Sequence, residues 1–182
     1  MWRGRVRKID DSERIIKDVE RARERTMNRA VKLLAAKPRS VAELRERLLE
    51  KVWTNAAIVD RVIVKLEEYK YLDDKQFASD LAASKLRQKP QGKRKLLQSM
   101  SRKKLSKENV DSAIASAFEK LPEADLIDKA IEKRLRLKGK PETREDTKKF
   151  YDHLLRNGFD FDLIRSKMSA VAKREILDEA AE

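Results

Sequence analysis

The sequence contains no cysteine, so it can form neither a disulfide framework nor a thiolate metal site. Glycine and proline, the two residues that break helices, number only four each among 182 residues. Aromatic residues make up 5% of the chain, and no convincing run alternates apolar with polar residues. Because strands favour aromatic and β-branched residues in such runs, we expect no sheet.

Long apolar stretches are also missing. No stretch approaches the roughly 18 apolar residues that a membrane span needs. The basic start at residues 1–8 is not followed by the apolar core of a signal peptide, so we expect a cytoplasmic protein. The chain has no glycine-rich phosphate loop, which argues against an ATP site, and no cofactor is expected.

What the chain does contain favours an all-α fold. It is 42% charged and 40% apolar, and its apolar residues recur at helical spacing, as in Ile58, Val62 and Leu66. The pattern predicts helices near residues 11–24, 25–36, 41–51, 55–69, 74–88, 92–103, 107–120, 123–138, 144–157 and 161–178. The first two can form one long helix, since no breaker separates them.

Several helix starts carry a capping residue. Ser40 followed by Glu43 is a capping box, in which each side chain can bond the backbone N–H of the other residue. Asp73 with Gln76 repeats this arrangement. Further candidate N-caps are Thr54, Ser106, Thr143 and Asp160.

The apolar pattern repeats along the chain. Positions 51 or 52 residues apart, and then 54 residues apart, match in three sets: Leu44, Leu48, Val59 and Ile63; Leu96, Met100, Val110 and Ile114; Phe150, Leu154, Ile164 and Met168. We therefore expect three tandem three-helix repeats in an elongated, curved array, with an extra N-terminal helix. The expected divisions are a basic extension over residues 1–24 and repeats over 25–72, 73–121 and 122–182.

Charge is concentrated in the middle repeat. The net charge is +13, yet outside residues 81–107 only 35 basic residues stand against 32 acidic ones. That window has ten basic residues and no acidic residue, so it predicts contact with a polyanion such as DNA or with an acidic protein surface. The candidate binding residues are Lys85, Arg87, Lys89, Lys93, Arg94, Lys95, Arg102, Lys103 and Lys104. Of these, we expect Arg94 and Lys95 to point outward.

Other interpretations of the window need no ligand. A charge run is commonly a solvated helix face, and Arg102, Lys103 and Lys104 also suit the negative end of a helix dipole. The backbone N–H groups at Pro90-Gln91-Gly92 can receive a phosphate, but we favour an ordinary turn between helices.

Nothing in the sequence predicts an enzyme. His153 is the only histidine, and without cysteine or a second histidine it makes a weak metal site. No set of nucleophile, base and orienting residue is present. The aromatic residues Trp53, Tyr69, Tyr71 and Phe77 can stack on bases, but we expect them in the core or between repeats.

Ordered motifs run from about residue 25 to residue 171. They include Arg39-Ser40-Val41-Ala42-Glu43-Leu44-Arg45, Tyr71-Leu72-Asp73-Asp74, Lys89-Pro90-Gln91-Gly92, Arg102-Lys103-Lys104-Leu105-Ser106 and Leu154-Leu155-Arg156-Asn157-Gly158-Phe159. In order and spacing they resemble the RecX family, the bacterial regulators of the RecA recombinase. The family usually has glycine where this chain has Lys70 and often where it has Lys104, and these departures affect local turn geometry.

The resemblance implies a negative regulator of RecA-mediated recombination and of the SOS response. Such a protein binds the RecA–DNA filament, in its groove or at its end, and inhibits ATP hydrolysis and strand exchange. We expect a monomer whose partners are the RecA filament and, through electrostatics, DNA. The alternatives are a stand-alone helical DNA-binding protein and a helical-repeat scaffold that binds only protein.

Overall fold

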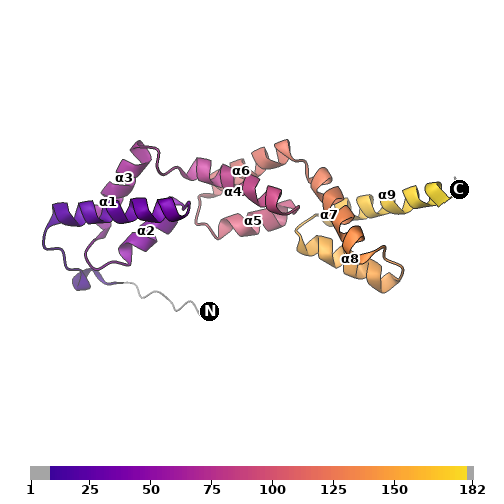
Figure 1. The fold of residues 1–182 in the computed structure, drawn as a ribbon, viewed down its shortest axis with the longest axis horizontal. Coiled ribbons are helices and arrows are strands. Elements are labelled where there is room, and N and C mark those ends of the chain that lie inside the picture. The colour runs from indigo at the N-terminus through magenta and orange to yellow at the C-terminus, as the bar shows by residue number, and fades with distance from the viewer. Residues whose placement is uncertain (1–8, 180–182) are drawn as a thin grey trace. The chain divides into compact units, whose positions relative to one another are not determined.

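A computed structural model describes the backbone of residues 9–179 and the side-chain environment of residues 9–170. This part of the chain contains helices and no strand (Figure 1). A 3-10 turn, η1, spans Asp11–Glu13 and precedes the α-helices: α1 Val19–Ala36, α2 Val41–Leu49, α3 Ala56–Glu68, α4 Asp74–Gln88, α5 Lys93–Ser101, α6 Lys107–Lys120, α7 Glu123–Lys138, α8 Arg144–Arg156 and α9 Phe161–Glu179. The all-α prediction is confirmed.

The helices belong to two compact units. Among the described residues, the first unit holds 9–78 and 103–109, and the second holds 79–102 and 110–179. In the first unit α1, α2 and α3 pack against one another, and in the second α7, α8 and α9 do the same. The expected elongation and curvature of the array stay predictions.

The extra N-terminal helix expected over residues 11–24 is wrong. Residues 11–13 form only the 3-10 turn, and a single helix, α1, begins at Val19. The physical reason is the Asp18 carboxylate, which accepts from the backbone N–H groups of Glu20 and Arg21 and so starts the helix there.

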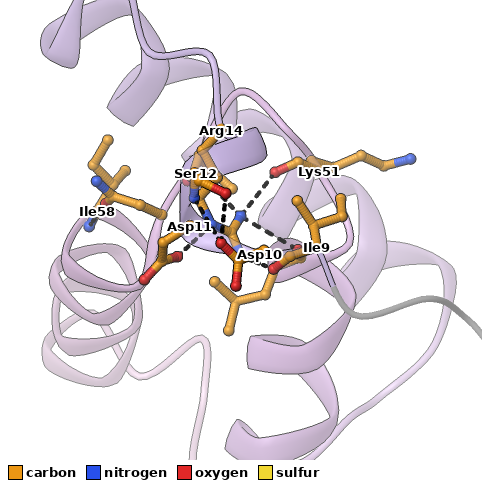
Figure 2. A network of polar contacts seen from close by, with 10 residues as sticks. Ile9, Asp10, Asp11, Ser12, Arg14, Lys51 and Ile58 are labelled. Atoms are coloured by element: carbon orange, nitrogen blue, oxygen red, sulfur yellow. Dashed lines mark hydrogen bonds and ion pairs between the residues drawn. The ribbon is translucent and has the colours of Figure 1, made fainter.

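Arg14 anchors the segment before α1 (Figure 2). Its side chain is 8% exposed, and its Nε donates to the Asp11 carboxylate at 2.7 Å. Nη2 donates to the Ile9 carbonyl at 3.3 Å. Nη1 lies within hydrogen-bond distance of three carbonyls at the end of α2 and in the turn that follows it: Leu49 at 3.5 Å, Lys51 at 3.2 Å and Thr54 at 2.7 Å. One guanidinium thus satisfies acceptors that the end of a helix leaves open.

Most predicted caps are formed. Ser40 Oγ accepts from the Glu43 N–H at 3.1 Å, and Asp73 Oδ1 accepts from the Gln76 N–H at 2.9 Å. Ser106, Thr143 and Asp160 also accept at the starts of their helices. Thr54 is the exception, because Asn55 caps α3 and Thr54 instead accepts from the buried Thr26 hydroxyl at 2.9 Å.

The repeat pattern is confirmed by burial. Eleven of the twelve matched apolar side chains are no more than 5% exposed, and Met168 is half-buried. The first repeat builds its core mainly from α1, α2 and α3 around Leu44, Leu48 and Val59, all fully buried. A buried stripe on each helix therefore holds each repeat together.

Successive repeats meet through the N-cap of the middle helix. In the first unit Ser40 Oγ donates to the Lys103 carbonyl at 2.6 Å. In the second unit the Gly92 N–H donates to the Asn157 carbonyl at 2.9 Å. Ser40 and Gly92 are 52 positions apart, and their acceptors are 54 positions apart, so both joints use equivalent places in the repeat.

Lys70 and Lys104 are the two described residues other than glycine with positive φ, at +60° and +56°. These are the two positions at which glycine was expected from the family resemblance. The left-handed turns are therefore kept, and each lysine carries the steric cost of its Cβ, about 1–2 kcal/mol. Both lysines are exposed, and Lys104 also pairs with Glu46.

Lys70→Gly is expected to stabilise the first unit by about 0.5–1 kcal/mol, because the relief of Cβ strain exceeds the added freedom of the unfolded chain. Urea denaturation followed by circular dichroism measures this difference. Lys70→Ala removes the same charge but keeps the Cβ, so it should leave stability unchanged. Equal stabilisation by alanine would attribute the effect to charge instead.

Candidate nucleic-acid interface

The predicted basic residues lie in and around α4 and α5. Lys85 and Arg87 are in the last turns of α4, Lys89 follows it, and Lys93 and Arg94 open α5. Arg87, Lys89, Lys93 and Arg94 are exposed, and Lys85 is half-buried. We call residues 85–94 the basic segment; within the described part of the chain none of its cations makes an ion pair.

Three of the predicted binding residues have partners inside the protein. Lys103 Nζ lies 3.1 Å from Glu43 Oε1, and Lys104 pairs with Glu46. Lys95 Nζ donates to the Arg156 carbonyl at 3.1 Å, at the end of α8. The expectation that Lys95 points outward is therefore wrong, because its ammonium donates to a carbonyl that the end of α8 leaves open. Burial lowers the pKa of this ammonium, as does nearby Lys89.

Arg102, the remaining predicted residue, is exposed at the C-cap of α5. It has no ion pair within the described residues, and a cation at this end suits the helix dipole. Its position is thus compatible both with a ligand and with simple helix stabilisation.

The backbone N–H groups of Gly92 and Lys93, at the start of α5, already have hydrogen-bond acceptors within the protein. The Gly92 N–H is used by Asn157, and the Lys93 N–H donates to Glu123 Oε1 at 2.9 Å. The interpretation of Pro90-Gln91-Gly92 as an ordinary turn agrees with these bonds, because the first free N–H groups do not face an open site. Any anion that binds here must therefore bind the side chains.

Cations in the first turn of α5 oppose the helix dipole. The first turn contains Lys93, Arg94 and Lys95 and no acidic residue. A cation near the positive end of a helix costs about 0.3–1 kcal/mol at low ionic strength. A cation at position 94 therefore lowers the stability of the free protein, and a bound anion would offset this unfavourable interaction with the helix dipole.

A second group of cations was missed from the sequence. Lys133, Arg134 and Lys138 of α7, together with Lys89, line a hollow of about 200 Å³ in the second unit. The sequence of α7 also contains the acidic residues Asp128 and Glu132, so this group of cations does not form a window free of acidic residues. Helical spacing was the available signal, because positions i, i+1, i+4 and i+5 share one face.

The aromatic residues divide between two environments. Trp53 is half-buried, with the Arg25 Cζ 4.3 Å from its ring centroid. Tyr69 and Tyr71 are 57% and 70% exposed, so of the two expected positions they occupy the one between repeats, in the segment that joins α3 to α4, and not the core. They flank the left-handed Lys70, and the turn directs them away from the core.

The described residues contain no group of three side chains suited to holding a metal ion. Among the same residues, no helix is long and apolar enough to cross a membrane.

Together, the fold and its cationic surface define a class: all-helical proteins of tandem three-helix units. Three family models match the chain in order, for the first, second and third RecX three-helix domains, over residues 27–66, 73–114 and 122–168. The chain belongs to the RecX family, which confirms the resemblance seen in its motifs.

Individual relatives agree with this assignment. Regulatory protein RecX of Chlorobaculum tepidum is 31% identical over 150 residues, which cover 82% of this chain and 89% of the relative. Regulatory protein RecX of Bacillus licheniformis is 27% identical, and the match spans 85% of this chain but 60% of that longer protein. The crystal structure of RecX from Lactobacillus salivarius has the same fold, with a TM-score of 0.73 at 18% identity, over 84% of this chain and 98% of that chain.

Proposed function

We propose that this protein is a non-enzymatic negative regulator of RecA. It binds the RecA–DNA filament, in the groove or at the end, and inhibits ATP hydrolysis and strand exchange, and thereby the SOS response. The observation that carries the proposal is the ordered match of all three RecX three-helix domains over residues 27–168. We infer that it acts as a monomer in the cytoplasm.

The basic segment is the proposed contact with the filament. Arg87, Lys89, Lys93 and Arg94 are exposed, and Arg94 is held where the dipole of α5 disfavours a cation. DNA phosphates or acidic RecA side chains would pair with these exposed side chains, which make no ion pair within the described part of the chain. Lys95, Lys103 and Lys104 already have internal partners and contribute less.

The direct test adds the purified protein to RecA and measures DNA-dependent ATP hydrolysis and co-sedimentation with filaments. We expect inhibition near stoichiometric amounts, together with binding to RecA-coated DNA. No inhibition and no co-sedimentation would contradict the proposal.

The two alternative functions predict other results. A stand-alone DNA-binding protein would bind bare duplex at least as tightly as RecA-coated DNA. The affinity of a protein-only scaffold would depend little on salt. For a DNA-binding protein, the logarithm of the binding constant falls as the logarithm of the salt concentration rises, with a slope of roughly −0.7 to −0.9 for each phosphate contact.

Arg87→Glu combined with Arg94→Glu is expected to weaken filament binding by about 10- to 100-fold, because each reversal costs about 1 kcal/mol once salt screens both the lost attraction and the added repulsion. Stability should change little, since the dipole opposes the first substitution and favours the second. Anisotropy of RecA-coated DNA measures the affinity, and circular dichroism the stability.

The matched control is Lys32→Glu with Lys148→Glu, on α1 and α8. Both lysines are exposed, and the pair changes net charge by the same amount. Equal weakening by the control would show that net charge matters and that the basic segment does not.

A further inference from the structure

The hollow of about 200 Å³ in the second unit is bounded by the residues before α5, one face of α7 and the end of α8. Four cations line it, Lys89, Lys133, Arg134 and Lys138, and no carboxylate does. None of the four makes an ion pair within the described part of the chain. The hollow therefore has a concentrated positive potential with no internal counter-ion.

Arg134 is held in place and has an unused donor. Its Cζ lies 5.3 Å from the centroid of the buried Phe150 ring. Its Nε is buried and has no hydrogen-bond partner. The terminal guanidinium nitrogens are the donors with which Arg134, as a lining residue, can bind an anion in the hollow.

The pKa of His153 is affected by the same positive potential. Its Nε2 lies 3.0 Å from Asn157 Nδ2, which donates to the neutral ring. Burial lowers the pKa of His153, and Arg134, Lys89, Arg156 and Lys95 lower it further. The charges that disfavour a protonated histidine are those that favour a bound anion.

The walls and size of the hollow restrict the ligand. Pro90, Ala130 and Leu137 contribute apolar surface beside the cations. The volume of about 200 Å³ is below the roughly 300–1,000 Å³ of pockets that enclose a small molecule. One phosphate with part of an attached sugar suits this space, and a whole cofactor does not.

We propose that this hollow binds one phosphodiester group of a single nucleic-acid strand. Arg134 and the lysines bind the phosphate oxygens, and Pro90 and Leu137 cover the adjoining sugar. This inference rests on the proposed function only in that the partner contains nucleic acid. It extends the DNA contact from the basic segment to α7 of the third repeat.

The single histidine makes the test direct, because its imidazole gives one assignable NMR signal in the full chain. Single-stranded oligothymidylate, without RecA, is expected to move this signal and to raise the pKa of His153 toward its usual range. The reason is that bound phosphate cancels part of the field from the surrounding cations.

Lys133→Glu with Lys138→Glu is expected to reduce affinity for the oligonucleotide at least tenfold and to reduce the pKa change between free and bound protein. Arg136→Glu is the control on the same helix, because Arg136 is exposed and does not line the hollow. It should keep the full pKa change.

Several results would overturn the proposal: an unmoved signal, an unchanged pKa difference in the double variant, or an equal response to poly-glutamate. A response to inorganic phosphate but not to oligothymidylate would identify a small-anion site and also overturn it. Because RecA is absent, failure here leaves the ATPase test of the proposed function unaffected.

Discussion

Gly92→Ala is expected to destabilise the second unit by about 3 kcal/mol, at the upper end of the cost of overpacking. A Cβ on Gly92 would lie closer than 3.0 Å to backbone atoms of Gly158 and Phe159, and backbone cannot turn aside as a side chain can. Gly92 has φ −81° and ψ 169°, a conformation that alanine adopts freely, so the loss would come from crowding.

The measurement is urea denaturation by circular dichroism, together with the NMR signal of His153, which lies in the same unit. The expected fall in melting temperature is roughly 6–12 °C for a chain of this size. Gly92→Ser is the decisive variant, because serine is a favoured N-cap but also carries a Cβ. If Gly92→Ser were as stable as the parent, poor capping rather than crowding would explain the alanine result.

Arg14→Ala is expected to destabilise the first unit by about 2–3 kcal/mol, in the upper part of the range of about 1.5–3 kcal/mol for hydrogen bonds to charged groups. The substitution leaves the carbonyls of Leu49, Lys51 and Thr54 without their shared donor. The Ile15 N–H, which donates to the Val52 carbonyl at 2.9 Å, should then still bind the segment to this turn.

Trp53 lies in this turn, so its fluorescence in a Trp2→Phe background reports the loss directly. Arg14→Lys is the matched variant: lysine keeps the charge but not the planar fork that reaches several acceptors, and should restore less than half of the stability. Full recovery with lysine would mean that charge, not the fork of donors, anchors the segment.

The helices could be predicted because each repeat has its own capping and burial signals. Ser40, Thr143 and Asp160 all cap where the sequence indicated, and the buried stripes follow the matched positions. The N-terminal segment could not, because its conformation depends on Arg14 bonding carbonyls 35 to 40 residues away. Capping residues and apolar spacing describe neighbours in the sequence, so they do not predict a contact between residues this far apart.

The candidate interface was predicted in part for the same reason. A count of charges locates the basic segment, but it does not reveal that Lys103 pairs with Glu43, 60 residues away, or that Lys95 bonds the end of α8. Nor does it bring Lys89 beside Lys133 and Arg134. Sequence identifies which charges exist, and tertiary packing decides which of them remain available.

The joints between repeats have a consequence for how such chains diverge after gene duplication. Both joints end on a main-chain carbonyl, of Lys103 or of Asn157, which every residue type provides. The hydrogen bond of the joint therefore sets no requirement on the side chain of the acceptor residue. The donor side cannot, because Ser40 needs its hydroxyl and Gly92 has no room for a Cβ. A duplicated copy of the middle repeat would therefore have to keep glycine at the position of Gly92 if it packed against a turn like that of Gly158. For this reason the two joints are not interchangeable.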